Sequence, residues 1–70
     1  MFYKNQETPE NCVSSVRRAA GMNQAELADA IGVTRQTIIA IEKGNYTPSI
    51  VLVLKLTKVL KTPIEELFWL

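Results

Sequence analysis

The sequence predicts an all-α fold, a compact bundle of five short helices. Apolar residues recur every three or four positions in several stretches, as expected for helices that bury one face. Residues that favour helix ends separate these stretches, among them Gly21, Gly32 and Gly44. No stretch alternates apolar and polar residues convincingly, apart from a weak possibility at residues 1–4.

The first two helices are predicted over residues 11–20 and from 24 to about 30. The first has apolar residues at helical spacing, and Gly21 follows it as a stop signal. Before the second, Asn23 occupies the N-cap position, with Glu26 three residues later. This arrangement is typical of a capping box, in which each side chain accepts a hydrogen bond from the other residue's backbone amide.

The third helix is predicted over residues 35–43. Thr34 can cap its first turn, and Gly44 ends it. The turn that separates it from the second helix contains Gly32 and Val33. Residues 24–43 thus form two short helices joined by a tight glycine-containing turn, the helix-turn-helix arrangement.

The last two helices are predicted over residues 50–60 and from 62 to the end of the chain. The fourth is unusually apolar, and Lys55 and Lys58 mark its solvent side. For the fifth, the sequence predicts a Thr62 cap, Pro63 at the first helical position and Glu65 completing a capping box. Residues 1–10 are expected to form an N-terminal extension.

Length and composition predict one small cytoplasmic domain without a cofactor. Seventy residues, 47% of them hydrophobic, are enough for one domain whose core contributes only about 3–5 kcal/mol. Cys12 is the single cysteine and there is no histidine, so neither an internal disulfide nor a metal site is expected. The N-terminus lacks the pattern of a secretory signal, and no apolar run has the length of a membrane helix. Self-association is the expected source of additional stability.

The net charge of +1 conceals an uneven distribution along the chain. Residues 1–11 and 62–70 are both acidic overall, whereas the segment between them has an excess of four positive charges. This middle segment is therefore the part that could contact a polyanion. On charge alone, the excess is equally compatible with an ordinary solvated surface.

The segment QAELADAIGVTRQTIIAIEKGNYTPS, residues 24–49, resembles the helix-turn-helix signature of the phage repressor and Cro-like family of transcription factors. The similarity continues through LVLKLTKVLKTPIEELF and covers roughly residues 12–68. The resemblance implies a five-helix bundle whose second and third helices bind double-stranded operator DNA, with many short members acting as homodimers on palindromic operators. In such units the second helix enters the major groove.

The resemblance assigns base reading to the start of the third helix. Arg35 can donate two hydrogen bonds to guanine, and Gln36 can pair with adenine. Ile39 and Ala40 offer only apolar contact, and Ile39 either meets a thymine methyl or indicates a different partner. The residues expected to contact the DNA backbone are Gln24, Thr34, Thr37, Lys43, Asn45, Tyr46 and Arg17. For Tyr46, packing over the fourth helix is an equal alternative, and Arg17 has the alternative of a salt bridge.

The C-terminal part of the chain carries more apolar surface than seventy residues can bury. We interpret this surface, residues 62–70 together with the fourth helix, as a dimer interface. The residues expected in it are Val51, Leu67, Phe68, Trp69 and Leu70. Alternatively, Trp69 folds back and completes the core of the monomer.

These observations favour a sequence-specific regulator of transcription, a repressor that binds an inverted-repeat operator as a homodimer. The alternative is a protein-interaction module, antitoxin-like or an adaptor, that uses the apolar fourth helix and C-terminus. An enzyme is not expected, because Cys12 has no histidine base and no glycine-rich phosphate loop is present. No small-molecule substrate and no membrane partner is indicated.

Overall fold

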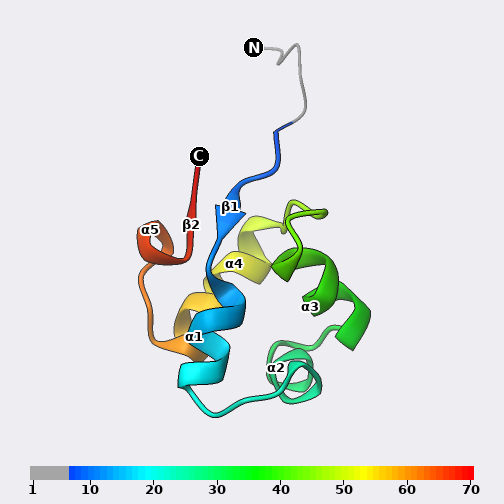
Figure 1. Ribbon diagram of the computed structural model, residues 1–70. Coiled ribbons are helices and arrows are strands. Elements are labelled where there is room, and N and C mark those ends of the chain that lie inside the picture. The colour runs from blue at the N-terminus through cyan, green and yellow to red at the C-terminus, as the bar shows by residue number, and fades with distance from the viewer. Residues whose placement is uncertain (1–6) are drawn as a thin grey trace.

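The computed structural model describes residues 7–70, and over these residues the protein is a helical bundle closed by a short two-stranded sheet (Figure 1). The elements in chain order are β1 (Glu10–Asn11), α1 (Val13–Ala19), α2 (Gln24–Ile31), α3 (Arg35–Glu42), α4 (Ile50–Leu60), α5 (Ile64–Leu67) and β2 (Phe68–Trp69). The predicted all-α class and the five helices are confirmed. The weak strand possibility at residues 1–4 lies outside the described residues.

The starts of α2 and α3 follow the predicted capping pattern, and α4 is capped in a similar way. The Asn23 side chain accepts a hydrogen bond from the Glu26 amide at 2.7 Å, and Glu26 accepts one from the Asn23 amide at 2.8 Å. Thr34 and Ser49 cap α3 and α4 in the same way, each through its hydroxyl oxygen. These caps satisfy amides that have no partner within the helix, which is why the three boundaries are encoded locally.

The start of α5 differs from the prediction. Pro63 is the N-cap, no side chain caps the helix, and the Thr62 hydroxyl donates to the carbonyl of Leu60 at 2.9 Å. The predicted Thr62 cap and the capping box with Glu65 are therefore wrong. Thr62 instead satisfies a carbonyl at the end of α4, where the chain turns through Lys61 with a φ of 52°.

The two ends of the described chain pair as antiparallel strands. Glu10 lies opposite Trp69, and Asn11 lies opposite Phe68. The pairing continues beyond the strands, because the Cys12 amide donates to the carbonyl of Leu67 at 3.0 Å. Two-residue strands are too short to show an alternating pattern, so no periodicity predicted them. The first helix consequently begins at Val13 and the last ends at Leu67.

Every helix contributes to one hydrophobic core. Its buried members are Val13, Leu27, Ala28, Ile31, Ile38, Ile41, Leu52, Leu56, Leu60 and Leu67. The α4 members are spaced four residues apart, so α4 presents a continuous apolar row to the core, where it packs against α2 and α5. Leu67 is completely buried, and its predicted place in a dimer interface is therefore wrong. No helix within residues 7–70 combines the length and the apolar character that a bilayer crossing requires.

Candidate nucleic-acid interface

The α2–α3 unit presents the start of α3 to solvent. Gly32 ends α2 with a φ of 75°, a left-handed conformation that glycine adopts without strain. Two residues later Thr34 begins α3, and its hydroxyl accepts a hydrogen bond from the Thr37 amide at 3.3 Å. Arg35 and Gln36, in the first turn of α3, are both exposed. The turn therefore places the two predicted base-reading side chains at the free end of the helix.

A polar groove of about 540 Å³ runs between α1, the start of α2 and the start of α3. Its lining residues are Arg17, Arg18, Asn23, Gln24, Ala25 and Arg35. Three arginines from two helices thus border one open hollow, which is the arrangement expected for a surface that receives a polyanion. Three of the seven basic residues of the middle segment therefore border this groove.

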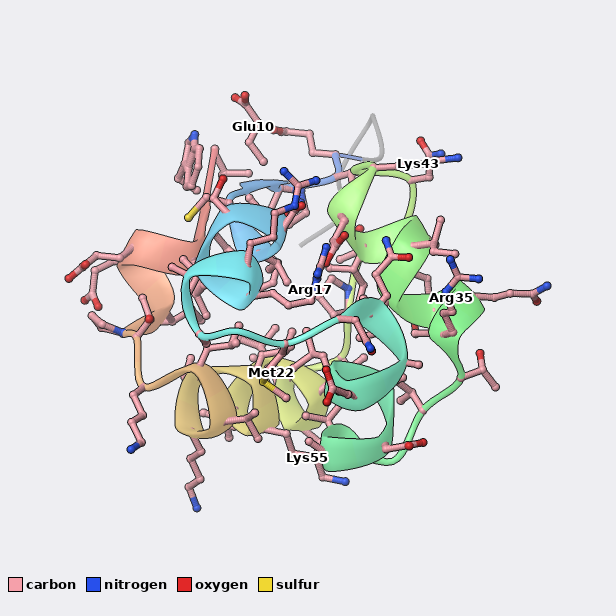
Figure 2. The ribbon with its side chains drawn as sticks, turned by 60° about the horizontal axis from the view of Figure 1, so that its bottom comes forward. Glu10, Arg17, Met22, Arg35, Lys43 and Lys55 are labelled. Atoms are coloured by element: carbon pink, nitrogen blue, oxygen red, sulfur yellow. The ribbon has the colours of Figure 1, made fainter. Side chains whose placement is uncertain are left out.

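Arg17 differs from its predicted role. Its side chain is buried, with Nε donating to Glu42 Oε2 at 2.7 Å and Nη2 donating to Oε1 at 3.3 Å. Its Nη1 donates to the carbonyl of Met22 at 2.8 Å. In Figure 2 Arg17 lies between α1 and the α2–α3 unit, whereas Arg35 lies on the outer edge of that unit. The prediction that Arg17 contacts the DNA backbone is corrected, because its guanidinium is already occupied; the alternative of a salt bridge is the correct one.

Glu42 joins three helices through its carboxylate. Besides Arg17 of α1, Gln24 of α2 donates to it, with Nε2 to Oε1 at 3.0 Å. Burial by itself raises the pKa of Glu42, but hydrogen bonds from Arg17 and Gln24, with the positive charges of Arg17 and Arg18, outweigh burial and lower the pKa. The same hydrogen bond raises the pKa of Arg17. The pair is therefore fully ionised at neutral pH and holds α1 against the end of α3.

The Gln24 side chain is held at the edge of the polar groove. One of its amide protons is used by Glu42, and the other proton and the carbonyl oxygen remain for a ligand. Gln24 is half-buried, so it is neither a core residue nor a freely moving surface side chain. Thr34 and Thr37 are likewise held, since their hydroxyl oxygens lie 3.2 Å apart.

The remaining predicted DNA-contacting residues lie on or after α3. Ile39 and Ala40 are half-buried, while Lys43 and Asn45 are exposed. Tyr46 is 42% exposed, so its ring is only partly covered. Figure 2 shows Lys43 at the opposite end of α3 from Arg35, so the predicted contacts follow the length of the helix.

A second, apolar hollow of about 270 Å³ lies beside the β1–β2 pair. It is lined by Pro9, Pro48, Val53, Ile64, Phe68, Trp69 and Leu70. Of the predicted interface residues, Phe68, Trp69 and Leu70 are brought together here, whereas Val51 is exposed on α4 outside this lining. We call the hollow, with the exposed Ile50 and Leu54 of α4, the apolar face.

Sequence reasoning missed Ile50, Leu54 and Ile64 as exposed apolar residues, although each is visible in the sequence as an apolar residue in a helix. Helical periodicity alone could have placed Ile50 and Leu54 on the exposed side of α4, because they are four residues apart and lie opposite the buried Leu52 and Leu56. The exposure of Ile64 depends on the position of α5, whose start the sequence analysis placed one residue too early.

The helix-turn-helix family model matches residues 13–67, from the start of α1 to the end of α5. The chain is 46% identical over 61 residues to the uncharacterized HTH-type transcriptional regulator YgzD of Bacillus subtilis (strain 168), covering 87% of this chain and 92% of that protein. It is 40% identical over 55 residues to the cryptic phage CTXphi transcriptional repressor RstR of Vibrio cholerae, covering 79% of this chain and 50% of that protein.

Among solved structures, the restriction-modification controller protein C.AhdI from Aeromonas hydrophila superposes with a TM-score of 0.73. The two sequences are 34% identical, and the match covers 80% of this chain and 85% of that one. The match to the family model thus extends over all five helices and includes the helix-turn-helix. The chain belongs to the helix-turn-helix family of DNA-binding transcriptional regulators.

Proposed function

We propose that the protein is a sequence-specific repressor that binds an inverted-repeat operator as a homodimer, with α3 in the major groove. The observation that carries the proposal is the polar groove, where the exposed Arg18 of α1 and Arg35 of α3 flank Gln24 at the start of α2. An α3 of eight residues with an exposed first turn fits a recognition helix, whose N-terminal residues contact base edges.

Base reading in this proposal falls to Arg35 and Gln36. Arg35 donates to guanine O6 and N7, and Gln36 pairs with adenine N6 and N7, each contributing about 1–3 kcal/mol of discrimination. Ile39 and Ala40 are half-buried and add apolar contacts, such as that with a thymine methyl group. With only two polar readers on α3, the half-site is short.

Phosphate contacts in this proposal come from both ends of α3 and from α2. The proposed residues are Gln24, Thr34, Thr37, Lys43, Asn45 and Tyr46, with Arg18 in place of Arg17. Arg18 is exposed and borders the polar groove, whereas the neighbouring Arg17 is used by Glu42. Such contacts position the protein on the duplex without reading sequence.

The apolar face is the proposed site of a second copy of this chain. Trp69 and Leu70 are 44% and 85% exposed, and Ile50 and Leu54 extend the apolar surface along α4. A two-fold interface is self-complementary, so one such face suffices for both partners. Figures 1 and 2 show α5 and α3 on opposite sides of the molecule. Two copies joined near α5 would therefore hold their recognition helices far apart, as the separation of about 34–36 Å between half-sites requires.

The repressor role rests on the relatives' names. RstR is described as a transcriptional repressor and C.AhdI as a controller protein, and the two matches cover 79% and 80% of this chain. In the proposal the dimer occupies an operator in the cytoplasm and excludes other proteins from the same DNA. The repressor assignment is tested by measuring transcription from a promoter that carries the selected site, which should fall when the protein is added.

Selection of bound fragments from a random DNA pool tests the proposed DNA reading. We expect an enriched inverted repeat for the wild-type chain and loss of the enrichment for the Arg35→Ala, Gln36→Ala double variant. Lys58→Ala is the control, because it removes a positive charge from the exposed side of α4, away from the polar groove. No enrichment with the wild-type chain would contradict the proposal.

A protein-interaction module is the second candidate, and the apolar face is the observation that favours it. The two functions differ in their dependence on salt. If a dimer neutralises about six phosphates, log K for DNA falls with log salt at a slope of roughly −5, whereas an apolar protein interface is nearly indifferent to salt. A salt-independent complex with a protein partner and no DNA binding would support the second candidate.

A further inference from the structure

Asn11 occupies a junction between the two chain ends and the recognition helix. Its backbone lies in β1, opposite Phe68 of β2. Its side-chain Nδ2 donates to the carbonyl of Ile41 in α3 at 2.8 Å, although the two residues are 30 positions apart. Its Oδ1 accepts a hydrogen bond from the Val13 amide, at the start of α1, at 3.0 Å. One side chain therefore uses both of its functional groups to join three elements.

The segment around Asn11 separates the apolar face from the end of α3. Pro9 lines the apolar hollow together with Phe68 and Trp69. Pro9 also lines a polar hollow on the other side, with Glu10, Asn11 and the end of α3 at Glu42 and Lys43. Figure 1 shows this segment running between the C-terminal strand and the helical body. Residues 8–11 thus form a strap, with the apolar face on one side and the recognition helix on the other.

The hydrogen bond from Asn11 supplies a second donor to a backbone carbonyl at the C-terminal end of α3. The Ile41 carbonyl lies in the last turn and also accepts from the Gly44 amide at 3.0 Å. Carbonyls of the last turn lack partners further along the helix, so an external donor fixes the position of this end. The opposite end of α3 is fixed separately, by Thr34 and by packing against α2.

We propose that Asn11 is a positioning residue that fixes the angle of α3 relative to the apolar face, and thereby sets the half-site spacing that the dimer accepts. The inference rests on the proposed function, since spacing has meaning only for a homodimer that joins through the apolar face. In B-DNA each added base pair moves a half-site by about 3.4 Å and rotates it by about 35°, so a rigid dimer accepts few spacings. Loosening the strap makes the dimer tolerant of more spacings, without changing the contacts within one half-site.

The test variant is Asn11→Asp. Aspartate keeps an acceptor for the Val13 amide, but when ionised it has no proton to donate to the Ile41 carbonyl. Asn11→Ser is a second variant that replaces the Nδ2 amide with a shorter hydroxyl and adds no charge, in case the carboxylate prevents folding. Val59→Ala is the control, because Val59 packs against the core from α4 and lies outside the strap. It loosens the core without altering the hydrogen bond to α3.

The measurement is the affinity of the full chain for duplexes that carry the two selected half-sites at centre-to-centre separations stepped through one helical turn. Each protein is also measured on a duplex with a single half-site. We expect the wild-type chain and Val59→Ala to prefer one spacing by about tenfold over its neighbours, and Asn11→Asp and Asn11→Ser to retain less than about threefold preference. Affinity for the single half-site should change by less than about twofold between the wild-type chain and the strap variants.

An unchanged spacing preference in both strap variants would overturn the inference and reduce Asn11 to a structural residue. A uniform loss of affinity at every spacing, with the preference retained, would overturn it in the same way. If the wild-type chain itself showed no preferred spacing, the homodimer proposal would fail first, and the inference with it. The wild-type profile thus separates the failure of the proposed function from the failure of the inference.

Discussion

Nε of Arg17 lies 2.7 Å from Oε2 of Glu42, and this ion pair between α1 and the end of α3 is almost completely removed from water. Glu42 also accepts from Gln24, which borders the polar groove. The proposed phosphate contact at Gln24 is therefore supported from inside the protein by the same carboxylate that anchors α1. Such a buried pair tolerates the loss of one partner poorly, because the remaining charge is left without compensation.

Glu42→Gln should make stability less dependent on acid pH. The pKa of Glu42 is lowered in the folded protein, so its contribution is complete above the ordinary carboxyl pKa of about 4.3 and is lost as the pH falls through the folded value. The variant should be less stable than the wild-type chain at pH 7, and the difference should shrink below pH of about 4.3. Urea unfolding between neutral and acid pH measures this, with the exposed Glu65→Gln as control. A constant difference at every pH would show that the charge of Glu42 is not involved.

Arg35→Ala and Lys43→Ala should weaken DNA binding in different ways. Loss of Arg35 should cost about 1–3 kcal/mol on the selected operator and relax discrimination at one base position. Loss of Lys43 should weaken binding to all sequences alike and reduce the salt slope by about one. Affinities for the operator and for single-base variants, each measured at several salt concentrations, distinguish the two. Identical behaviour of the variants would contradict the proposed division between base and phosphate contacts.

Trp69→Ala should dissociate the proposed dimer. Buried aromatic residues at the centre of an interface cost about 2 kcal/mol or more when truncated, roughly a thirtyfold weaker association. Sedimentation at several protein concentrations measures the shift, and Lys61→Ala, at an exposed position beyond α4, is the control. Unchanged sedimentation together with a lower unfolding temperature would assign Trp69 to the fold of the monomer.

Gly32→Ala should destabilise the helix-turn-helix by about 1–2 kcal/mol, because a left-handed conformation is unfavourable for residues with a Cβ. The φ of Gly32 is 75°, and an added Cβ would meet no atom within 4 Å, so the cost arises from the backbone and not from a clash. Gly32→Asn should lose less, since asparagine tolerates this conformation better. Denaturant midpoints of the two variants test the order; equal losses would contradict this cause.

Lys61→Gly should stabilise the protein by about 0.5–1 kcal/mol, whereas Gly32→Ala should destabilise it. Lys61 ends α4 with a φ of 52°, the only positive φ of a non-glycine residue among residues 7–70. Glycine removes the strain of this conformation, although part of the gain is offset by the greater freedom of glycine in the unfolded chain. Thermal unfolding checks the prediction, and a lower midpoint would show that the Lys61 side chain contributes more than its backbone strain costs.

The sequence by itself determined the features that depend on neighbours in the chain. The starts of α2 and α3 were predictable from Asn23 with Glu26 and from Thr34, because a cap acts over three residues. Ser49 caps α4 by the same local contact. Gly32 fixed the turn for the same reason. The exposure of Arg35 and Gln36 followed from their place in the first turn of α3, opposite the buried Ile38 and Ile41.

Only the tertiary structure decided which residues become partners over long separations. The sequence does not distinguish the roles of the neighbouring Arg17 and Arg18. In the structure, Glu42, 25 residues after Arg17, pairs with Arg17, which is buried, while Arg18 is exposed. From the sequence, Leu67 and Trp69 are equally good candidates for an interface. In the structure, where β1 pairs with β2, Leu67 lies in the core and Trp69 stays exposed. The physical reason is that a local pattern records what each residue prefers, whereas burial and ion pairing depend on which distant segments the packed core brings together.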